Sequence, residues 1–307
     1  MDVLWFVPTM RQRAVEWDET MNKSKCSFPG RNLCAPGGKI SALFVDVDGT
    51  IMKCDPYFEA ARQRFGYLMH SLYGFDKDEA IKLAQGLYMV NMKRNGVERD
   101  QLSLAMVTAY KRLCRRANPR IRPVKEVIGM CEDIGNSPFF RQPELFPNAT
   151  PVLNRSHHNF LIIGVTMGNR EAQKHKIRMG GLESVFDHYI ITPYDNKAER
   201  VRELIEDLNI DPHHSAFIGN STRSDGNCLS QTNVVLVPFE KGVFDDENLP
   251  ESKEFDVYRV RDWRDAEERV LQRLIMRRDR AVQLEEAEQQ QHALQGKCPN
   301  CNGGCGK

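Results

Sequence analysis

Residues 43–51 read Leu43-Phe44-Val45-Asp46-Val47-Asp48-Gly49-Thr50-Ile51. An apolar, strand-forming run here ends in two carboxylates, two positions apart, and in a Gly-Thr turn. Side chains at i and i+2 of a strand point the same way. Asp46 and Asp48 should therefore face one small volume at the carboxyl end of a strand, where open α/β sheets build their sites. Carboxylates this close need a cation or a proton. A divalent metal, with one carboxylate as nucleophile and the other as proton carrier, would meet that need.

Two other interpretations of this stretch have to be compared with the catalytic one. A calcium-binding loop that began at Asp46 would need glycine at its sixth position and glutamate at its twelfth. The chain has Ile51 and Tyr57 there, which excludes a calcium loop of this type. An ordinary strand-to-turn junction remains open, but it gives no reason for a buried strand to end in two acids.

The composition limits the classes of function. With 307 residues and a formal charge of +1, the chain can form one large domain or two modest ones, and it has no overall field that would attract nucleic acid or an anionic membrane. No apolar run approaches the length of a membrane span, and the short apolar start lacks the basic leader of a secretory signal. We therefore expect a cytoplasmic protein whose partner is neither nucleic acid nor a membrane. The sequence does not indicate an oligomeric state.

Strand-like and helical segments alternate outside one long helical block. Apolar segments at 40–47, 160–166, 189–191, 215–219 and 234–237 predict strands, and the helices between them predict a parallel sheet with right-handed crossovers. Apolar residues spaced three and four apart predict helices in the block. The expected fold class is α/β, with a Rossmann-like parallel sheet and an inserted helical domain. The predicted layout is an N-terminal extension (1–38), an α/β core (39–54 and 144–276), the helical insertion (55–143), a charged helical tail (277–297) and a Cys-rich terminus (298–307).

The order of these features resembles the haloacid dehalogenase-like (HAD) superfamily over about residues 40–275. The resemblance implies a HAD-like core with a helical cap that closes over the site. It also implies that Asp46 is a nucleophile forming an aspartyl-phosphate, and that Asp48 is the general acid for the leaving group and later the base for water. A second carboxylate at the position of Asp48 resembles the phosphatase branch, because the dehalogenase branch lacks it.

Two further elements of the resemblance concern phosphate. Thr166, at the end of a strand, resembles the hydroxyl residue of the second motif, and a hydroxyl with the following backbone N–H groups suits phosphate oxygens. Lys197 best matches the third-motif lysine, which neutralises phosphate and the nucleophile. Lys174 and Lys176 compete for this role but lie on the preceding predicted helix.

The fourth motif departs from the family pattern. It reads Gly219-Asn220-Ser221-Thr222-Arg223-Ser224-Asp225, so asparagine stands where the family has its first acid. The resemblance implies Mg²⁺ held by Asp46, Asp48, Asn220 and Asp225. An amide oxygen can bind magnesium but brings no charge. The sequence therefore leaves two alternatives, a metal site that still supports turnover with Asp225 carrying the charge, and a site that has lost strong hydrolysis.

The Cys-rich terminus is separate from that pattern. Cys298, Cys301 and Cys305 include a Cys-x-x-Cys pair, which is half of a common zinc site. The fourth ligand would have to be His292, Cys26, Cys34 or a residue of a second chain. Free thiols in a terminal peptide are the alternative.

Two functions follow from these observations. The first is a magnesium-dependent phosphomonoesterase acting through Asp46 on a small phosphorylated metabolite. The second is a HAD-fold protein with weakened catalysis that serves as a binding or regulatory module, with zinc in its terminus. Asn220 is the residue that favours the second.

Overall fold

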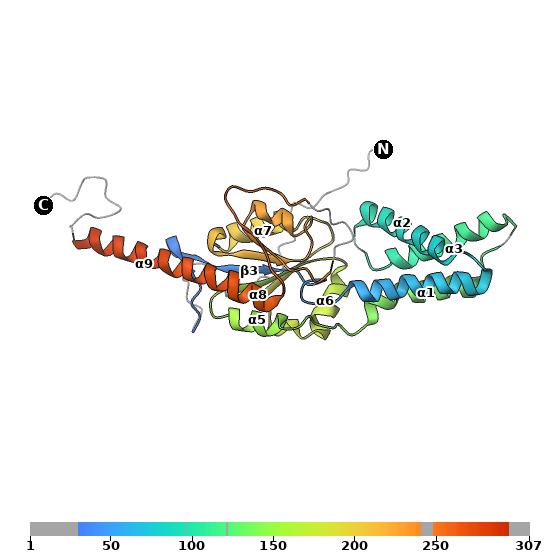
Figure 1. Cartoon of the computed structure of the whole chain (residues 1–307), viewed down its shortest axis with the longest axis horizontal. Coiled ribbons are helices and arrows are strands. Elements are labelled where there is room, and N and C mark those ends of the chain that lie inside the picture. The colour runs from blue at the N-terminus through green and yellow to red at the C-terminus, as the bar shows by residue number, and fades with distance from the viewer. Residues whose placement is uncertain (1–29, 97, 121, 241–247, 295–307) are drawn as a thin grey trace, which may run out of the picture.

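The five predicted strand segments and one further strand, which the sequence did not predict, pair into a six-stranded parallel sheet (Figure 1). A computed structural model describes residues 30–96, 98–120, 122–240 and 248–294. The strand order is β5-β4-β3-β6-β7-β8. In chain order the strands are β3 (Ala42–Val45), β4 (Leu161–Met167), β5 (His188–Thr192), β6 (Ala216–Gly219), β7 (Asn233–Leu236) and β8 (Val257–Arg259). Before them, β1 (Cys34–Ala35) and β2 (Lys39–Ile40) form a separate antiparallel hairpin. The predicted α/β class with a parallel sheet is confirmed.

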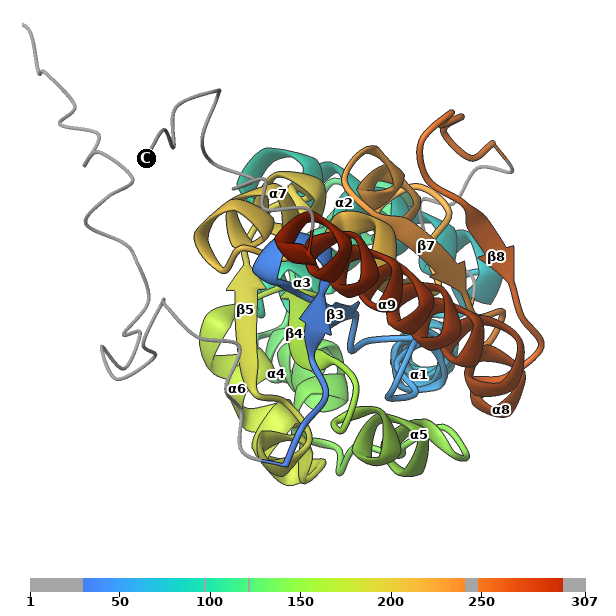
Figure 2. The ribbon, with the colours of Figure 1, turned by 90° about the vertical axis from the view of Figure 1, so that its left-hand side faces the viewer.

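Helices cover both faces of the sheet (Figure 2). Leu43 and Val45 point to one face, and Ala42 and Phe44 to the other, and all four are fully buried, as expected for a parallel strand between two helical layers. The first face packs against α5 (Ala149–Ser156), α6 (Arg170–Met179), α8 (Trp263–Ala266), the π-helical turn η7 (Glu267–Leu271) and the start of α9 (Gln272–Leu294). The second packs against α7 (Lys197–Asp207) and the 3-10 turn η6 (Gly226–Ser230).

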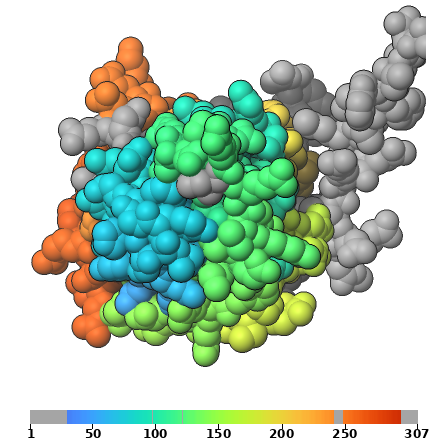
Figure 3. All heavy atoms as spheres, turned by 90° about the vertical axis from the view of Figure 1, so that its right-hand side faces the viewer, coloured from blue at the N-terminus to red at the C-terminus, as the bar shows by residue number. Residues whose placement is uncertain are grey.

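The helical block between β3 and β4 packs as a separate apolar cluster. It consists of α1 (Asp55–Tyr73), α2 (Lys77–Asn95), α3 (Gln101–Ala117), α4 (Lys125–Asn136) and the 3-10 turn η3 (Ser137–Phe140). Phe65, Met69 and Tyr110 are fully buried at its centre. Gly74 ends α1 in the left-handed conformation, φ 67°, that glycine adopts at low cost. These helices form one end of the molecule, seen face-on in Figure 3. We call them the cap.

The remaining short helices are connectors: η2 (Pro36–Gly38), η4 (Leu182–Ser184) and η5 (Pro212–His214). None of the helices in the described ranges has an apolar stretch long enough to cross a membrane. Residues 1–29 of the predicted N-terminal extension and the whole Cys-rich terminus lie outside the described residues. The domain boundaries therefore stay predictions.

One arginine in the charged C-terminal helix is unlike its neighbours. Arg278 of α9 is fully buried, and its guanidinium donates to the backbone oxygens of Asn32 and Asn159, both at 2.7 Å. Its Nη2 also contacts Asp279 at 2.7 Å. A charged group can be buried when it is paired and hydrogen-bonded in this way. Arg278 thus joins α9 to the start of the core, which the charge pattern of the sequence did not indicate.

Candidate active site

The predicted site residues meet at the carboxyl edge of four neighbouring strands. Asp46 directly follows β3, Thr166 lies near the end of β4, and Asn220 directly follows β6. Lys197 begins α7, the helix that follows β5. The order β5-β4-β3-β6 makes these strands neighbours, and because they are parallel their carboxyl ends share one edge of the sheet.

The two aspartates of the first motif lie on a turn rather than on the strand itself. β3 ends at Val45, two residues earlier than the sequence predicted, and the N–H groups of Ile51 and Met52 donate to the Val47 oxygen at 2.9 and 3.0 Å. Gly49 in this turn has φ 78°, and a Cβ there would lie 2.5 Å from the Asn220 amide nitrogen. Glycine is therefore required both by the backbone conformation and by the closeness of the fourth-motif loop.

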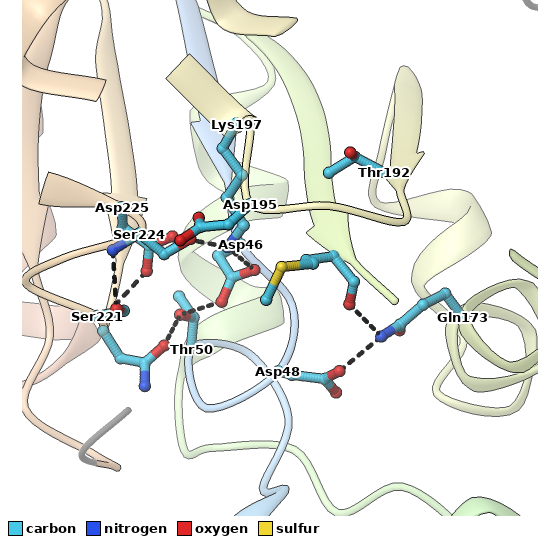
Figure 4. A network of polar contacts seen from close by, with 12 residues as sticks. Asp46, Asp48, Thr50, Gln173, Thr192, Asp195, Lys197, Ser221, Ser224 and Asp225 are labelled. Carbon is cyan, nitrogen blue, oxygen red and sulfur yellow. Dashed lines mark hydrogen bonds and ion pairs between the residues drawn. The ribbon is translucent and has the colours of Figure 1, made fainter. Parts of the chain in front are cut away.

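A buried lysine joins the first and fourth motifs (Figure 4). The Lys197 ammonium donates to Asp46 Oδ1 at 2.6 Å and to Asp225 Oδ1 at 2.7 Å, and the three side chains are at most 5% exposed. Burial raises the pKa of Asp46, Lys197 opposes the rise and Asp225 adds to it, so that this pKa comes to about 7. Burial alone would lower the pKa of Lys197, but the two carboxylates outweigh it and raise the pKa above its usual value.

Asp48 has a different lysine partner. The Lys176 ammonium donates to both Asp48 oxygens, at 2.7 and 2.6 Å, and Gln173 Nε2 donates to Oδ2 at 2.7 Å. Burial favours the protonated acid, but the Lys176 charge and these hydrogen bonds outweigh it and hold the pKa of Asp48 below its usual range. Of the three lysines considered from the sequence, Lys197 contacts Asp46, Lys176 contacts Asp48, and Lys174 lies near Glu171 on the same helix.

The amide of Asn220 is held in one orientation. Its Oδ1 lies 3.0 Å from the Thr50 hydroxyl, which lies 3.1 Å from Asp46 Oδ2, and its Nδ2 donates to the Glu240 backbone oxygen at 2.8 Å. The side chain of Glu240 accepts from the N–H groups of Cys54 and Asp55 at the start of α1, at 2.9–3.0 Å. Asn220 therefore presents an oxygen beside the nucleophile, and its nitrogen contributes to the junction between core and cap.

Thr166 and the acids open into one cavity of about 190 Å³. The lining includes Asp46, Asp48, Thr166, Lys197 and Asn220, but not Asp225, which lies behind Lys197. Thr166 is 1% exposed, and its hydroxyl is a buried polar atom without a hydrogen-bond partner in the described part of the chain. Buried hydroxyls normally have a partner, so this group is suited to an oxygen-rich ligand in the cavity.

The oxygens at this site suit a small, hard cation only in part. Mg²⁺ in proteins is often held by one or two carboxylates, with water and substrate phosphate as its other ligands. Asp46 and Asn220 fit that role, because their oxygens are joined through the neutral Thr50 hydroxyl. Asp48 and Asp225 contact lysines, and Asp46 also accepts from Lys197 through its other oxygen, Oδ1. Among the described residues no three His, Cys, Asp or Glu side chains form a metal-binding cluster. Cys298, Cys301 and Cys305 lie outside the described residues, so zinc binding stays a prediction.

Several contacts of the site were not predicted from the sequence. Gln173 and Lys176, spaced three apart on α6, approach Asp48; Thr50 links Asp46 to Asn220; and Glu240 connects the core to α1. The i, i+3 spacing of Gln173 and Lys176 places both on one helix face, which was the only available signal. The contact between Glu240 and Asp55 joins residues about 185 positions apart, and no nearby sequence pattern indicates it.

Comparison with known proteins agrees with this arrangement. Residues 40–225 match the haloacid dehalogenase-like hydrolases, and the chain belongs to this family of hydrolases. No curated protein sequence matches the chain significantly.

Two solved structures show the same fold, and a third is similar at a lower TM-score. A haloacid dehalogenase-like family hydrolase from Xanthomonas campestris is 17% identical, with a TM-score of 0.60, covering 81% of this chain and 98% of its own. A defluorinating L-2-haloacid dehalogenase is 14% identical, with a TM-score of 0.51 and coverage of 76% and 96%. A putative HAD-hydrolase from Bacillus subtilis, described as bound to magnesium, is 18% identical, with a TM-score of 0.46 and coverage of 74% and 96%. These neighbours include dehalogenases, so the fold leaves the reaction open within the family.

Proposed function

We propose that this hydrolase is a cytoplasmic, magnesium-dependent phosphomonoesterase that acts through an aspartyl-phosphate at Asp46 on a small phosphorylated metabolite. The observation that carries the proposal is the second carboxylate, Asp48, in the same cavity as Asp46 and the unpartnered Thr166 hydroxyl. Phosphoryl transfer to Asp46 needs a group that gives a proton to the leaving oxygen and later takes one from water, and we assign this role to Asp48. The dehalogenase branch, by resemblance, lacks this carboxylate.

The reaction divides into two steps. Lys176 holds the pKa of Asp48 low in the free site, and the negative charge of the bound ester opposes this effect and favours the protonated acid. The Asp46 carboxylate attacks phosphorus, the bond from phosphorus to the ester oxygen breaks, and the protonated Asp48 gives its proton to the departing alcohol. Asp48 then takes a proton from water, the water oxygen attacks phosphorus, and phosphate leaves as Asp46 is regenerated. Lys197 neutralises Asp46 and the phosphoryl oxygens, and Thr166 donates to one of those oxygens.

The charge of the site supports a divalent cation. Three carboxylates, Asp46, Asp48 and Asp225, are opposed by two ammonium groups, Lys176 and Lys197, which leaves one net negative charge facing a dianionic ester. Asp46 and Asn220 would hold Mg²⁺, which supplies positive charge to the phosphoryl group and favours the ionised form of Asp46.

Lys176→Met should shift the pH dependence of the reaction. Without the lysine, the pKa of Asp48 rises, because burial is no longer offset by the neighbouring charge. A general acid works only while protonated, so the alkaline limb of the kcat/KM profile should move to higher pH. Profiles of the wild type, Lys176→Met and Lys174→Met test this. If the Lys176→Met profile overlays that of Lys174→Met, Asp48 is not the acid.

Asn220→Asp tests the departure from the family motif. The new carboxylate should bind Mg²⁺ more tightly, but an oxygen replaces the nitrogen that donates to the Glu240 carbonyl at 2.8 Å. Loss of that hydrogen bond should cost about 1–3 kcal/mol of stability in the metal-free protein. Calorimetric Mg²⁺ titration and thermal unfolding measure both effects, with the exposed Asn227→Asp as a control that adds the same charge nearby. Unchanged magnesium affinity would remove Asn220 from the metal site.

The same variant distinguishes the proposed phosphatase from a second candidate function. A HAD-fold protein with weakened catalysis, acting as a binding or regulatory module, is favoured by Asn220 and by the role of its amide at the junction of core and cap. In that case the wild type hydrolyses p-nitrophenyl phosphate negligibly, and Asn220→Asp raises the rate. A wild type with ready turnover excludes this second function.

A further inference from the structure

The cap contributes an aromatic wall to the cavity. We infer that this wall selects phosphomonoesters whose leaving group is a single apolar ring, of the benzyl type, over phosphomonoesters with a polyhydroxylated leaving group. The inference rests on the proposed phosphatase function and specifies its substrate class. The wall consists of Phe58 of α1, Tyr88 and Met92 of α2, and Phe139 of η3. It faces the acids and lysines of the core across the cavity.

The three rings are in contact and so form one continuous surface. Phe58 and Tyr88 stack with ring centres 6.4 Å apart at 28°, and Phe58 and Phe139 meet edge to face at 5.6 Å and 85°. Aromatic side chains favour a further ring in stacked or edge-to-face geometry. A planar apolar leaving group therefore finds partners that an extended polyol does not.

The charges around the cavity disfavour a second anionic group on the substrate. Two arginines line the cavity, and both are paired with acids. Arg62 Nε lies 2.9 Å from Glu59 Oε2, and Arg223 Nη2 lies 3.3 Å from Asp195 Oδ2. The acids Asp55 and Glu240 also line the cavity, where helix α1 begins. A leaving group with a second phosphate or a carboxylate would meet these acids, whereas a neutral ring meets the aromatic wall.

The size of the cavity limits the leaving group to about one ring. A cavity of roughly 150 Å³ lined by apolar side chains holds one benzene molecule, and this one measures about 190 Å³ including the space beside Asp46. A phosphoryl group and a single ring fill that space. A nucleotide or a two-ring group would extend beyond this space.

The test compares two esters whose leaving groups are both primary alcohols, benzyl phosphate and ribose 5-phosphate. The full-length protein with Mg²⁺ should hydrolyse benzyl phosphate with a kcat/KM at least ~10-fold higher, the scale on which apolar pockets discriminate. Phe139→Ala should bring the ratio down several-fold. Phe140→Ala is the matched control, because the neighbouring Phe140 is 66% exposed and lies outside the cavity.

Binding of phosphonates, which are not hydrolysed, separates failure of this inference from failure of the phosphatase proposal. Benzylphosphonate should bind at least ~10-fold more tightly than methylphosphonate by calorimetry, with the difference reduced in Phe139→Ala and kept in Phe140→Ala. Equal kcat/KM for the two esters, with activity present, overturns the ring selectivity and does not affect the phosphatase proposal. If neither ester is hydrolysed, the phosphatase proposal is wrong, and the phosphonate affinities alone test the aromatic wall. Tighter binding of benzylphosphonate then supports the aromatic wall, and equal binding overturns it.

Discussion

Asp46→Asn should abolish phosphatase activity while leaving the fold intact. Asparagine has the shape of the aspartate and can still accept a hydrogen bond from Lys197, but its amide does not form an acyl phosphate. Loss of a covalent nucleophile removes a reaction path and not just a contact, so we expect kcat to fall by about 10⁴-fold or more. Steady-state hydrolysis of p-nitrophenyl phosphate with Mg²⁺ measures the loss.

The control for this variant is the same substitution at an exposed acid. Asp207→Asn, at the end of α7, removes one charge far from the cavity and should keep full activity. Thermal unfolding should show that Asp46→Asn is folded. Activity within ~10-fold of the wild type in a folded Asp46→Asn protein would eliminate Asp46 as the nucleophile.

Lys197→Met should produce the largest loss of stability. The ammonium group contacts two buried carboxylates, at 2.6 and 2.7 Å, and methionine leaves both without a counter-charge. Removal of one partner from a buried ionic group typically costs about 3–5 kcal/mol, which for a domain of this size lowers the melting temperature by roughly 6–20 °C. Phosphatase activity should also be lost, because the lysine neutralises the nucleophile and the phosphoryl group.

The pH dependence of this destabilisation distinguishes charge from packing. The pKa of Lys197 is raised in the folded protein, so its stabilising contribution is fully present at neutral pH. In Lys197→Met the buried carboxylates have no counter-charge, and only protonation removes the cost of burying their charge. The loss in free energy of unfolding relative to the wild type should therefore be larger at pH 8 than at pH 5. The exposed Lys82→Met is the control. A loss of stability independent of pH would indicate a packing defect in place of an unpaired charge.

The convergence of Asp46, Thr166, Lys197 and Asp225 could be predicted from the sequence for a physical reason. Each follows, or lies near the end of, a segment whose apolar residues marked it as a buried strand, and parallel strands place their carboxyl ends at one edge. The long helical block was equally clear, because its three- and four-residue spacing is maintained over several helices.

What could not be predicted depends on contacts between distant parts of the chain. Lys176 was considered from the sequence only as a competitor of Lys197 for the third-motif lysine, and its contact with Asp48 follows from the fold. Arg278 lies in the predicted charged helical tail, and its burial depends on contacts with residues far away in the sequence. The strand β8 has three residues, too few for a periodic pattern. The identity of Asn220 could be read from the sequence, but its contacts with Thr50 and Glu240 could not.

The central claim, an aspartyl-phosphate at Asp46, can be tested by chemical trapping. The protein is incubated with Mg²⁺ and either a phosphomonoester or a 2-haloacid, then reduced with borohydride, which converts an aspartyl phosphate or an aspartyl ester into homoserine. Peptide mass spectrometry then identifies the residue at position 46. The phosphatase account predicts homoserine at this position after the phosphomonoester and not after the haloacid. Homoserine after the haloacid alone, or after neither substrate while the phosphomonoester is being hydrolysed, would contradict it.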